Sequence, residues 1–548
     1  MNFNKDSLYF LPLGGCGEIG MNLNLYHDQG KWIMVDMGIT FDDTPGIEVV
    51  MPDISFLEEI KDNLLGLVLT HAHEDHYGAI PYLWKKVKCP IFATPFTAEM
   101  LKFKLKEAGI HPPLHVVPLK GGIDIGPFAI DFINLTHSIP EPNALAIKTS
   151  KGTILHTGDW KIDPEPLVGH VTDEDKLKAL GKEGVLALVC DSTNVFEEGR
   201  SGSEAAIRQN LIDVVGKYPG RRVLIACFAS NVARVASGYE AAHQNGRHPI
   251  LVGRSLEKVD SAARESGYFQ GMLPFLKAYD AKALDRGKTL LICTGSQGEQ
   301  KAALRRIASG EDKHIILEEG DVVIFSSRQI PGNGKQIDEL QNMLVDQGVE
   351  VVTHVEADIH VSGHPCRDEL VEMYGWTKPQ ILIPVHGEDK HLAEQAKLGR
   401  VCQIPNTVVP HNGTVVEITS SQARIVGEVP HGRLAVDGNV LIPFGGEAMH
   451  TRHRMMANGQ IVVTLVLSGK GQLKALPEIL FFGVGEIHEE EMLIEECGSA
   501  LESSLDSLTQ DDLMDDEFLK EHVRVLVRRI INAARGKKPP THVQVIRV

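Results

Sequence analysis

Four side chains that commonly bind metals stand within six residues of one another, directly after a short apolar segment. The segment GLVLT (66–70) leads into His71, His73, Asp75 and His76. Histidine is not favoured in protein cores, and imidazolium ions held this close would repel one another unless a cation kept them neutral. Imidazole nitrogen together with carboxylate oxygen suits Zn²⁺ or Mn²⁺. The pattern therefore predicts a divalent metal site on a loop that leaves a strand.

The spacing within this cluster suits two ions better than one. On such a loop His71 and His73 can point one way while Asp75 and His76 turn another. Because these ligands are too few for two ions, further ligands are expected at other strand ends. Three residues follow apolar, strand-like segments: His137 in INLTHSIP, Asp159 in LHTGDWKID and His386 in ILIPVHGE. Taken singly, each also fits a turn histidine or a helix-capping aspartate, but together with the cluster they complete a two-metal set in which Asp159 is suited to bridging.

The segments around these residues predict the scaffold that positions them. Residues 8–40 alternate between apolar runs and turns, as β-hairpins do, and a helix-like stretch, HYGAIPYLWKKV, overlaps the end of the histidine cluster. We expect residues 1–200 to form the first part of an α+β layered sandwich, built mostly from antiparallel strands with helices laid over them. The runs 381–387 and 415–429 return to this texture. Residues 355–440 are therefore expected to complete the same domain.

The chain between these two parts has the alternating strand and helix pattern of a parallel sheet. RRVLIACFA, PILVGR, TLLICTG and DVVIFSS are short apolar strands separated by helical segments. We expect residues 201–354 to form an inserted α/β domain, opened by a helix that Ser201 caps with Glu204 three positions later. Residues 441–548 are expected to form a small C-terminal α+β domain with an alternating strand, an acidic stretch and a terminal amphipathic helix.

A glycine-rich motif near the start of the chain imitates a dinucleotide-binding fingerprint. Gly15, Gly17 and Gly20 match G-x-G-x-x-G after a strand. That fingerprint must open a helix whose N-terminus holds pyrophosphate. Here Gly20 runs into NLNLY and a short turn, which leaves no room for a helix. We expect a glycine-rich hairpin that forms the floor of a site.

The formal net charge of −18 argues at first against a nucleic-acid partner, because phosphate binding requires Lys and Arg. The charge is unevenly distributed, however. Residues 486–517 hold 13 Asp and Glu and no Lys or Arg, whereas residues 200–310 hold 17 Lys and Arg against 9 Asp and Glu. The net charge therefore does not exclude a nucleic-acid partner for the inserted domain.

Cysteine usage and hydropathy indicate where the protein acts. The eight cysteines are scattered singly without a C-x-x-C pair, which favours a reduced, cytoplasmic compartment. The chain start lacks a basic segment followed by a long apolar one, and no uncharged apolar run reaches the roughly 18 residues that a membrane span needs. We expect no membrane partner.

The motif H-x-H-x-D-H, followed by a lone His, a lone Asp and a later His, resembles the metallo-β-lactamase superfamily. Asp191 in VCDSTN, His364 in HVSGHP and His386 in PVHGE resemble the three further motifs of its β-CASP branch, which processes nucleic acids and is defined by an inserted domain. The strings FLPLGGCGEIGMN, FASNVARV, CTGSQGE, SSRQIPGN and HVSGHP are similar to the ribonuclease J family in particular. The resemblance covers nearly all of residues 8–440, and the basic terminal helix is similar to that family's C-terminal domain.

The resemblance implies a metallo-β-lactamase fold and specific roles for the candidate residues. One ion would be held by three histidines, His71, His73 and His137. The second ion would be held by Asp75, His76 and His386. Asp159 would bridge the two ions, which are expected to be Zn²⁺, with Mn²⁺ or Mg²⁺ as alternatives. Asp36 and Asp191 would be carboxylates that orient the ligands.

The resemblance also implies a substrate and a reaction. The run His360, Val361, Ser362, Gly363 and His364 would bind the 5′-phosphate region of single-stranded RNA, with His364 as a candidate general acid. The enzyme would hydrolyse RNA from a 5′-monophosphate end in the 5′→3′ direction and would also cut internally, in RNA maturation and decay. A homodimer or homotetramer is expected.

Three alternatives remain open at this point. One is a thioester or lactone hydrolase of the same superfamily, which would share the ligands without needing the insertion. Another is a nuclease that acts on DNA, and the third is a catalytically inactive scaffold in an RNA-decay assembly. Five basic residues of the insertion are further candidates for contacts with a nucleic-acid backbone: Arg221, Arg222, Arg234, Arg254 and Lys258.

Overall fold

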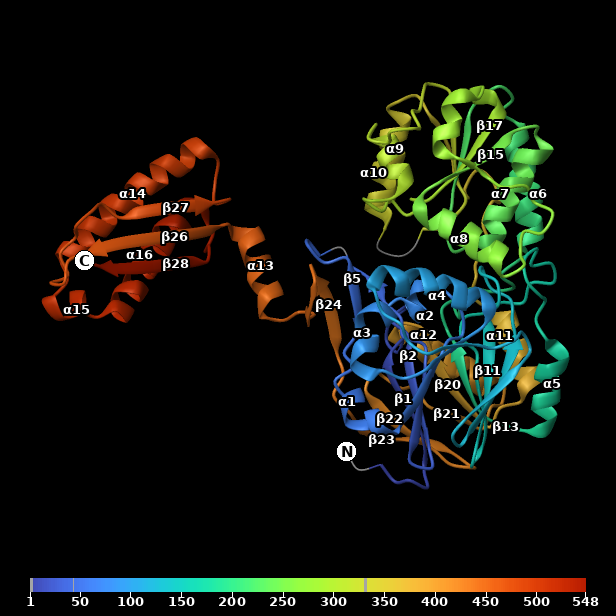
Figure 1. Ribbon diagram of the computed structural model, residues 1–548. Helices are drawn as coiled ribbons and strands as arrows, with labels where there is room; N and C mark the ends of the chain where they lie inside the picture. Colours follow the sequence, from blue (N-terminus) through green and yellow to red (C-terminus); the bar gives the residue numbers. More distant parts are fainter. Residues whose placement is uncertain (1–2, 43, 330–332) are drawn as a thin grey trace. The chain divides into compact units, whose positions relative to one another are not determined.

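The computed structural model describes residues 3–42, 44–329 and 333–548 of the chain (Figure 1). They form two compact units, Met1–Leu441 and Ile442–Val548. The first unit contains a sandwich of two sheets and a domain inserted into it. Because its strands are rich in Val, Ile and Leu and its helices carry one apolar face each, every layer has a surface that must be covered.

The first sheet of the sandwich has the strand order β23-β22-β1-β2-β3-β6-β7-β8. Strands β22, β1, β2 and β3 pair antiparallel, whereas β3, β6, β7 and β8 pair parallel. The bounds are β1 (Leu8–Gly14), β2 (Leu23–Asp28), β3 (Lys31–Val35), β6 (Leu64–Val68), β7 (Ile91–Ala93), β8 (Leu114–Val116), β22 (Thr414–Ile418) and β23 (Ala423–Glu428).

The second sheet has the order β21-β20-β13-β12-β11-β10-β9. Strands β9 to β12 form an antiparallel meander, and β12, β13, β20 and β21 run parallel. The bounds are β9 (Gly122–Ile125), β10 (Phe128–Asn134), β11 (Asn143–Thr149), β12 (Gly152–His156), β13 (Val185–Asp191), β20 (Ile381–Val385) and β21 (Asn406–Thr407). The sequence prediction of mostly antiparallel strands was therefore too simple. Strands joined by a crossover helix run parallel, and such helices connect half of each sheet.

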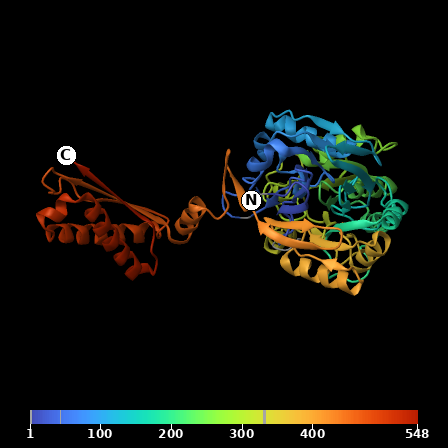
Figure 2. The same cartoon turned by 90° about the horizontal axis from the view of Figure 1, so that it is seen from below.

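Helices cover the outer face of each sheet. The first sheet is covered by α1 (Leu57–Ile60), α3 (Ile80–Val87) and α4 (Pro95–Ala108), and the second by α5 (Glu174–Glu183), α11 (Arg367–Thr377) and α12 (Asp389–Val401). Figure 2 shows the blue helices on one side and the orange helices on the opposite side, with the strands between them. Apolar side chains such as Phe10, Ile33, Phe132 and Ile383 fill the space between the sheets. This is the layered α+β sandwich that the sequence predicts.

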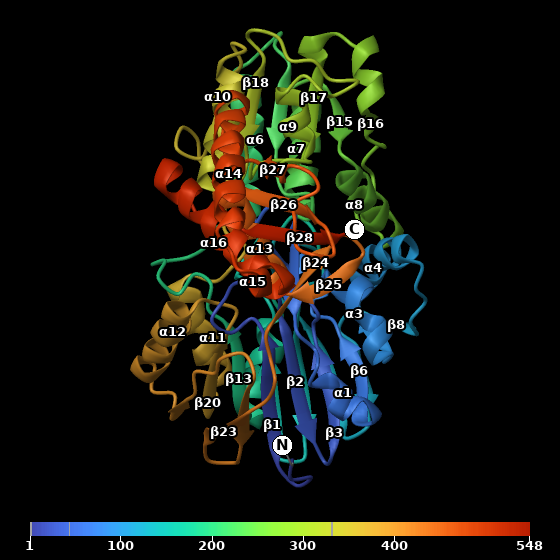
Figure 3. The same ribbon diagram turned by 90° about the vertical axis from the view of Figure 1, so that its left-hand side faces the viewer.

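The inserted domain is built on a parallel sheet with the order β16-β15-β17-β14-β18-β19. Its strands are β14 (Val223–Ala226), β15 (His248–Val252), β16 (Leu276–Lys277), β17 (Thr289–Cys293), β18 (Val322–Phe325) and β19 (Glu350–Val352). Its helices are α6 (Glu204–Gly216), α7 (Val232–Gln244), α8 (Arg254–Glu265), α9 (Ala303–Ala308) and α10 (Gly334–Val345). Helix α8 lies against α4 of the sandwich (Figures 1 and 3).

One local prediction for this domain was wrong. Helix α6 is capped by Ser203, whose hydroxyl accepts a hydrogen bond from the Ala205 amide, and not by Ser201. Ser201 instead donates its hydroxyl and its amide to the buried Glu369 carboxylate. Ser201, two positions before the capping residue, thus anchors the chain to Glu369 where the chain leaves the sandwich.

Shorter elements complete the first unit. Strand β5 (Val49–Pro52) pairs with β4 (Thr40–Phe41) and β24 (Arg433–Asp437). Strand β25 (Val440–Pro443) follows β24 and contains the boundary between the two units. The single-turn helix α2 (Glu74–Tyr77) belongs to the metal-binding motif. The 3₁₀ helices are η1 (Lys61–Asn63), η2 (Ala278–Ala283) and η3 (Arg286–Lys288).

The C-terminal unit has a sheet in the order β27-β26-β28, formed by β26 (Gln460–Leu467), β27 (Glu478–Phe482) and β28 (Thr541–Arg547). Its helices are α13 (Glu447–Asn458), α14 (Ile487–Asp506), α15 (Gln510–Met514) and α16 (Asp516–Arg535). The inward side chains of β26 pack against Leu501 of α14 and against Val523 and Ile531 of α16. The apolar face of the terminal helix is therefore used for core packing within this unit, and the acidic stretch is largely helical.

Candidate metal centre

The predicted metal ligands meet at one edge of the sandwich. They follow the carboxyl ends of four strands, with the histidine cluster after β6, His137 after β10, Asp159 after β12 and His386 after β20. Strands β10 and β12 both run antiparallel to β11, while β12, β13 and β20 run parallel, so their carboxyl ends lie at the same edge. The topology, rather than the sequence spacing, brings these side chains together.

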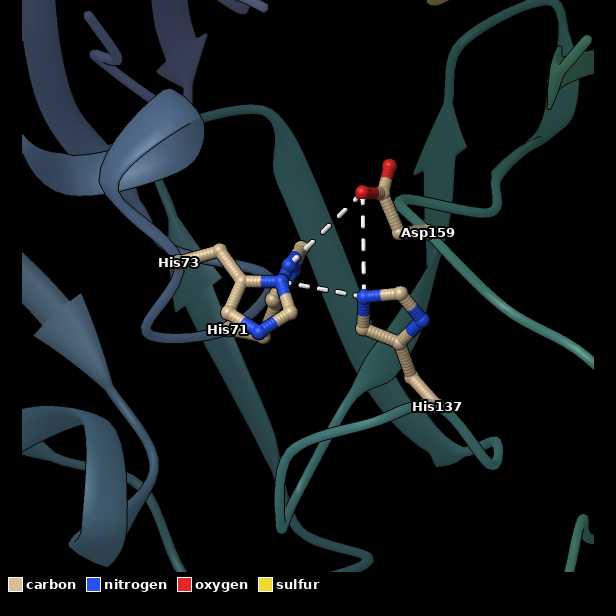
Figure 4. A group of neighbouring side chains, drawn as sticks. All are labelled: His71, His73, His137 and Asp159. Atoms are coloured by element: carbon tan, nitrogen blue, oxygen red, sulfur yellow. Dashed lines mark hydrogen bonds and ion pairs between the residues drawn. The ribbon is translucent and has the colours of Figure 1, made fainter. Parts of the chain in front are cut away.

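His71, His73, His137 and Asp159 form the first group (Figure 4), with one potential ligand atom from each lying within 4.8 Å of all the others. His137 Nε2 is 3.0 Å from His73 Nδ1, and both His71 Nε2 and His137 Nε2 are 3.9 Å from Asp159 Oδ2. A tetrahedral ion with bonds of about 2.0–2.1 Å separates its ligands by about 3.3 Å. The spacing of this group is therefore that of a divalent metal site.

Asp75, His76, Asp159 and His386 form the second group by the same criterion. His76 Nε2 lies 3.2 Å from Asp159 Oδ2, and His386 contacts Asp75 and Asp159 at 3.2 and 3.0 Å. Asp75 and His76 lie in α2, whereas His71 and His73 precede it in a loop, with His73 in extended conformation. The change from loop to helix turns the two halves of the motif toward different groups, and Asp159 is shared by both.

The electrostatics of the two groups differ. Burial lowers the pKa of His71 well below its ordinary value, with help from the neighbouring imidazoles, and lowers that of His73 to about 4. Burial would also lower the pKa of His76, but the surrounding carboxylates, Asp159 foremost, raise it well above its ordinary value. The first group therefore offers neutral imidazoles, the form that ligates metals, and the second has a strong demand for positive charge.

A buried carboxylate holds the motif in place. Asp36 follows β3 and accepts hydrogen bonds from the Thr70 amide at 2.8 Å and from the Thr70 hydroxyl at 2.8 Å, and it lies 2.7 Å from His76 Nδ1. An ionised carboxylate can only accept, so His76 must donate from Nδ1 and present the lone pair of Nε2 to the second group. The sequence predicted Asp36 in an orienting role, but nothing in it assigned a role to Thr70.

The glycine-rich segment near the start forms the floor that the sequence predicts. Gly15 has a φ of +88° and its carbonyl accepts the His386 amide at 2.6 Å, while Cys16 makes a bridge to Gly387. Gly38 shows the same close packing, since a Cβ there would lie 1.7 Å from the Asp75 carbonyl oxygen. These glycines allow backbone to approach the ligand-bearing loops, and no helix starts at Gly20.

The run from His360 to His364 reaches the same edge. His364 Nδ1 lies 2.8 Å from the Asp191 carboxylate, and the Gly363 carbonyl accepts a hydrogen bond from His137 Nδ1. Asn194, which the sequence did not single out, donates to the Ser362 hydroxyl and to the His364 carbonyl. His360 and Val361 are partly buried at its start. The similar motif SSRQIPGN (326–333) lies partly outside the described residues, because 330–332 are not among them.

Two of the basic residues predicted to contact a nucleic-acid backbone do not fit that role. Arg222 and Arg234 are 5% and 1% exposed and bind internal partners. Arg221 pairs with Glu350 and Lys258 pairs with Glu107, while Arg254 is exposed. The predictions for Arg222 and Arg234 were wrong because sequence alone does not distinguish a buried arginine from a solvated one.

Comparison with known proteins identifies the family. Family models match along the chain, namely the metallo-beta-lactamase superfamily over residues 22–181, "Ribonuclease J, beta-CASP domain" over 220–344, "Zn-dependent metallo-hydrolase RNA specificity domain" over 348–407 and "Ribonuclease J C-terminal domain" over 447–548. A protein of Sinorhizobium meliloti named ribonuclease J is 42% identical over 99% of this chain and 98% of its own length. The chain belongs to the ribonuclease J family. A Helicobacter pylori ribonuclease J is 34% identical over 98% of this chain and 80% of its own length.

Membership of the ribonuclease J family confirms the predicted fold, a metallo-β-lactamase domain with a β-CASP insertion and a small C-terminal domain. It also makes the protein a metal-dependent hydrolase of the ribonuclease class. A crystal structure of a protein of unknown function from Enterococcus faecalis shares the fold, with a TM-score of 0.52, 16% identity and coverage of 75% of this chain and all of its own. Within residues 3–42, 44–329 and 333–548, no helix has the length and apolarity needed to cross a membrane.

The buried polar atoms of the centre fit the divalent ions that this family implies. Among the described residues, His71 Nε2, which lies 3.9 Å from Asp159 Oδ2, is buried without a hydrogen-bond partner. A buried polar atom without a hydrogen-bond partner destabilises the folded protein, and a metal ion bound to that atom would remove this destabilisation. The described residues form three overlapping groups of possible ligands, the third being Asp159, Asp191, His364 and His386. The first two groups share the Asp159 carboxylate, and together they suit two divalent ions.

Proposed function

We propose that the protein hydrolyses RNA with two divalent ions, Zn²⁺ in the first instance and Mn²⁺ or Mg²⁺ as alternatives. His71, His73 and His137 would hold one ion, and Asp75 with His76 and His386 would hold the other. Asp159 would bridge them. The observation that carries this assignment is that Asp159 belongs to both ligand groups. When bound, such ions would polarise a phosphoryl oxygen and lower the pKa of a bound water molecule.

His364 is proposed as the general acid for the leaving oxygen. Burial would lower its pKa, but the hydrogen-bonded Asp191 carboxylate outweighs burial and raises the pKa above its ordinary value. A protonated imidazole whose Nε2–H is free can donate that proton to a leaving group. Asp191 fixes the ring from the other side, and the 22% exposure of the His364 side chain gives substrate access.

The segment 360–364 is proposed to bind the 5′-phosphate end of single-stranded RNA. The Ser362 hydroxyl and the backbone around Gly363 offer hydrogen bonds to phosphate oxygens, and Asn194 holds both the hydroxyl and the backbone in place. This supports 5′→3′ hydrolysis from a monophosphate end together with internal cleavage, in RNA maturation and decay. We also propose a homodimer or homotetramer and a cytoplasmic location, the latter because the eight cysteines stand singly in the sequence.

The test is cleavage of three matched substrates by one preparation: 5′-monophosphorylated RNA, triphosphorylated RNA and DNA, each with Zn²⁺, Mn²⁺ or Mg²⁺. We expect the monophosphorylated RNA to be degraded fastest, with mononucleotides released from the 5′ end. The control is the double variant Asp75→Ala, His76→Ala, which should be inactive. Equal cleavage by this variant would refute the metal centre, and a preference for DNA would refute the substrate.

A further inference from the structure

A buried ionic network connects the two places where the chain passes between the sandwich and the inserted domain. The outgoing crossing, residues 192–203, joins β13 to α6, and the return crossing, residues 353–366, joins β19 to α11. The return crossing contains the segment 360–364. Its position relative to the metal centre is therefore set by whatever holds the two crossings.

Arg234 in the first turn of α7 lies at the middle of this network and is 1% exposed. Its Nε and Nη2 donate to the Glu204 carboxylate at 3.2–3.3 Å. Its Nη1 donates to the Ser326 carbonyl and hydroxyl at 2.7 and 2.6 Å and to the Ile359 carbonyl at 3.1 Å. The Ser326 hydroxyl also donates to the Ile359 carbonyl, at 2.7 Å. One guanidinium thus fixes the backbone directly before His360.

The other side of the network reaches the metal centre. Glu204 is 1% exposed, and its amide donates to the Asp163 carboxylate at 2.9 Å. The same carboxylate lies 3.0 Å from Lys161 Nζ, which donates to the Gly202 carbonyl of the outgoing crossing at 3.2 Å. Lys161 is fully buried and stands two residues after Asp159. The loop that carries Asp159 is therefore held by the same network as the return crossing.

The two crossings also pack directly against each other. A Cβ added to Gly202 would lie 3.0 Å from Val361 Cγ1, so the two crossings approach each other closely at this point. The buried Glu369 carboxylate accepts hydrogen bonds from Ser201 of the outgoing crossing, from the Cys366 amide of the return crossing and from the Ile162 amide. Each crossing is thus tied to the loop that follows Asp159.

We propose that Glu204 and Arg234 are positioning residues for the reaction, which place segment 360–364 over the metal centre by joining the inserted domain to both crossings. This inference rests on the proposed role of that segment. A buried ion pair costs desolvation, and apolar replacements of such pairs are often as stable, so stability alone does not require one here. The planar guanidinium gives fixed directions to several partners at once, which a lysine ammonium does not.

The test compares Arg234→Lys and Glu204→Gln with the unmodified enzyme and with the control Asp321→Asn. Asp321 is also a buried acid of the inserted domain and pairs with Arg286, but it precedes β18, at the opposite end of the strand from Ser326. Measurements are kcat and KM on 5′-monophosphorylated RNA, melting temperature, and amide hydrogen exchange over residues 357–366, all at a temperature where each variant is folded.

We expect Arg234→Lys and Glu204→Gln to lower kcat/KM by about tenfold to hundredfold, the size of effect produced by a misplacement of about 1 Å, and to speed exchange in the return crossing. Asp321→Asn should lower the melting temperature and leave kcat/KM within about twofold, because it does not contact either crossing. If Arg234→Lys does not fold, Glu204→Gln alone decides the matter.

Two results would overturn the inference. One is a folded Arg234→Lys or Glu204→Gln with unmodified kcat/KM and exchange, and the other is an equal loss of kcat/KM in Asp321→Asn. The variants Ser362→Ala and His364→Ala separate this failure from failure of the proposed function. If they lower kcat/KM while Glu204→Gln does not, only the positioning role is lost. If they also have no effect, the proposed role of segment 360–364 is wrong.

Discussion

Replacing Asp36 by asparagine should weaken metal binding by about tenfold to hundredfold while leaving the fold intact. Asp36 has a φ of +63°, a conformation that asparagine tolerates as well as aspartate does, so the substitution adds no backbone strain. The side chain is fully buried and is surrounded by the Thr70 amide, the Thr70 hydroxyl and His76 Nδ1. The amide group of asparagine must therefore oppose one of these partners.

Two orientations of the amide are available, and both disfavour the metal-bound state. If its NH₂ replaces Oδ2, it points at His76 Nδ1 and forces the tautomer in which Nε2 carries the proton, which removes the lone pair that would bind the ion. If its NH₂ replaces Oδ1, it opposes the Thr70 amide and leaves buried donors unpaired at a cost of about 1–3 kcal/mol. Loss of an orienting partner costs about 10- to 100-fold in metal affinity, which corresponds to about 1.4–2.8 kcal/mol.

The assay is a competition titration of the metal-free protein with a chromophoric chelator, accompanied by melting curves with and without metal. Asp28→Asn is the matched control, because Asp28 is equally buried but binds Ser150 at the far end of β2. Both variants should lose some stability, and only Asp36→Asn should lose metal affinity. If Asp36→Asn binds metal within about twofold of the unmodified protein, Asp36 does not set the His76 tautomer.

Three further predictions concern other parts of the chain. Dialysis against a chelator should lower the melting temperature, and adding metal at about 100 times its Kd should raise the free energy of unfolding by about 2.7 kcal/mol. Identical melting curves with and without metal would argue against a preformed metal centre. Ile531→Ala should destabilise the C-terminal unit by about 2–5 kcal/mol because Ile531 is fully buried. Val525 is 40% exposed, so Val525→Ala should change the stability of that unit by less than about 0.5 kcal/mol. Denaturant unfolding measures both changes, and equal losses would contradict the assigned buried face of α16. Arg254→Glu should reduce the salt slope of RNA binding by about one, and an unchanged slope would remove Arg254 from the RNA path.

The sequence predicted the fold class and singled out candidate ligands, but it did not predict the strand directions. Histidines and carboxylates that cluster after apolar segments are seldom placed there by packing alone, so candidate ligands can be selected from the residue pattern without knowledge of the fold. The direction of strand pairing was harder to predict. The short apolar sequences of β6 and β7 would fit parallel and antiparallel pairing equally well. Ser201 shows a similar limit. Its spacing to Glu204 matches a capping box, yet its hydroxyl binds Glu369, which is 168 residues away.

The sequence by itself determined which residue types are available for metal binding and that they follow strands, since local patterning reports strand ends and loops. Only the tertiary structure decided that Asp159 lies in both ligand groups, that Thr70 and Asn194 hold the motif and the 360–364 segment, and that Arg234 is internal. These facts depend on contacts between residues far apart in the chain, which the strand order of two sheets and one insertion creates. Burial also determines whether a charged side chain contacts solvent, substrate or other protein groups. The burial of such a side chain cannot be predicted from the residue itself or from its neighbours in the sequence.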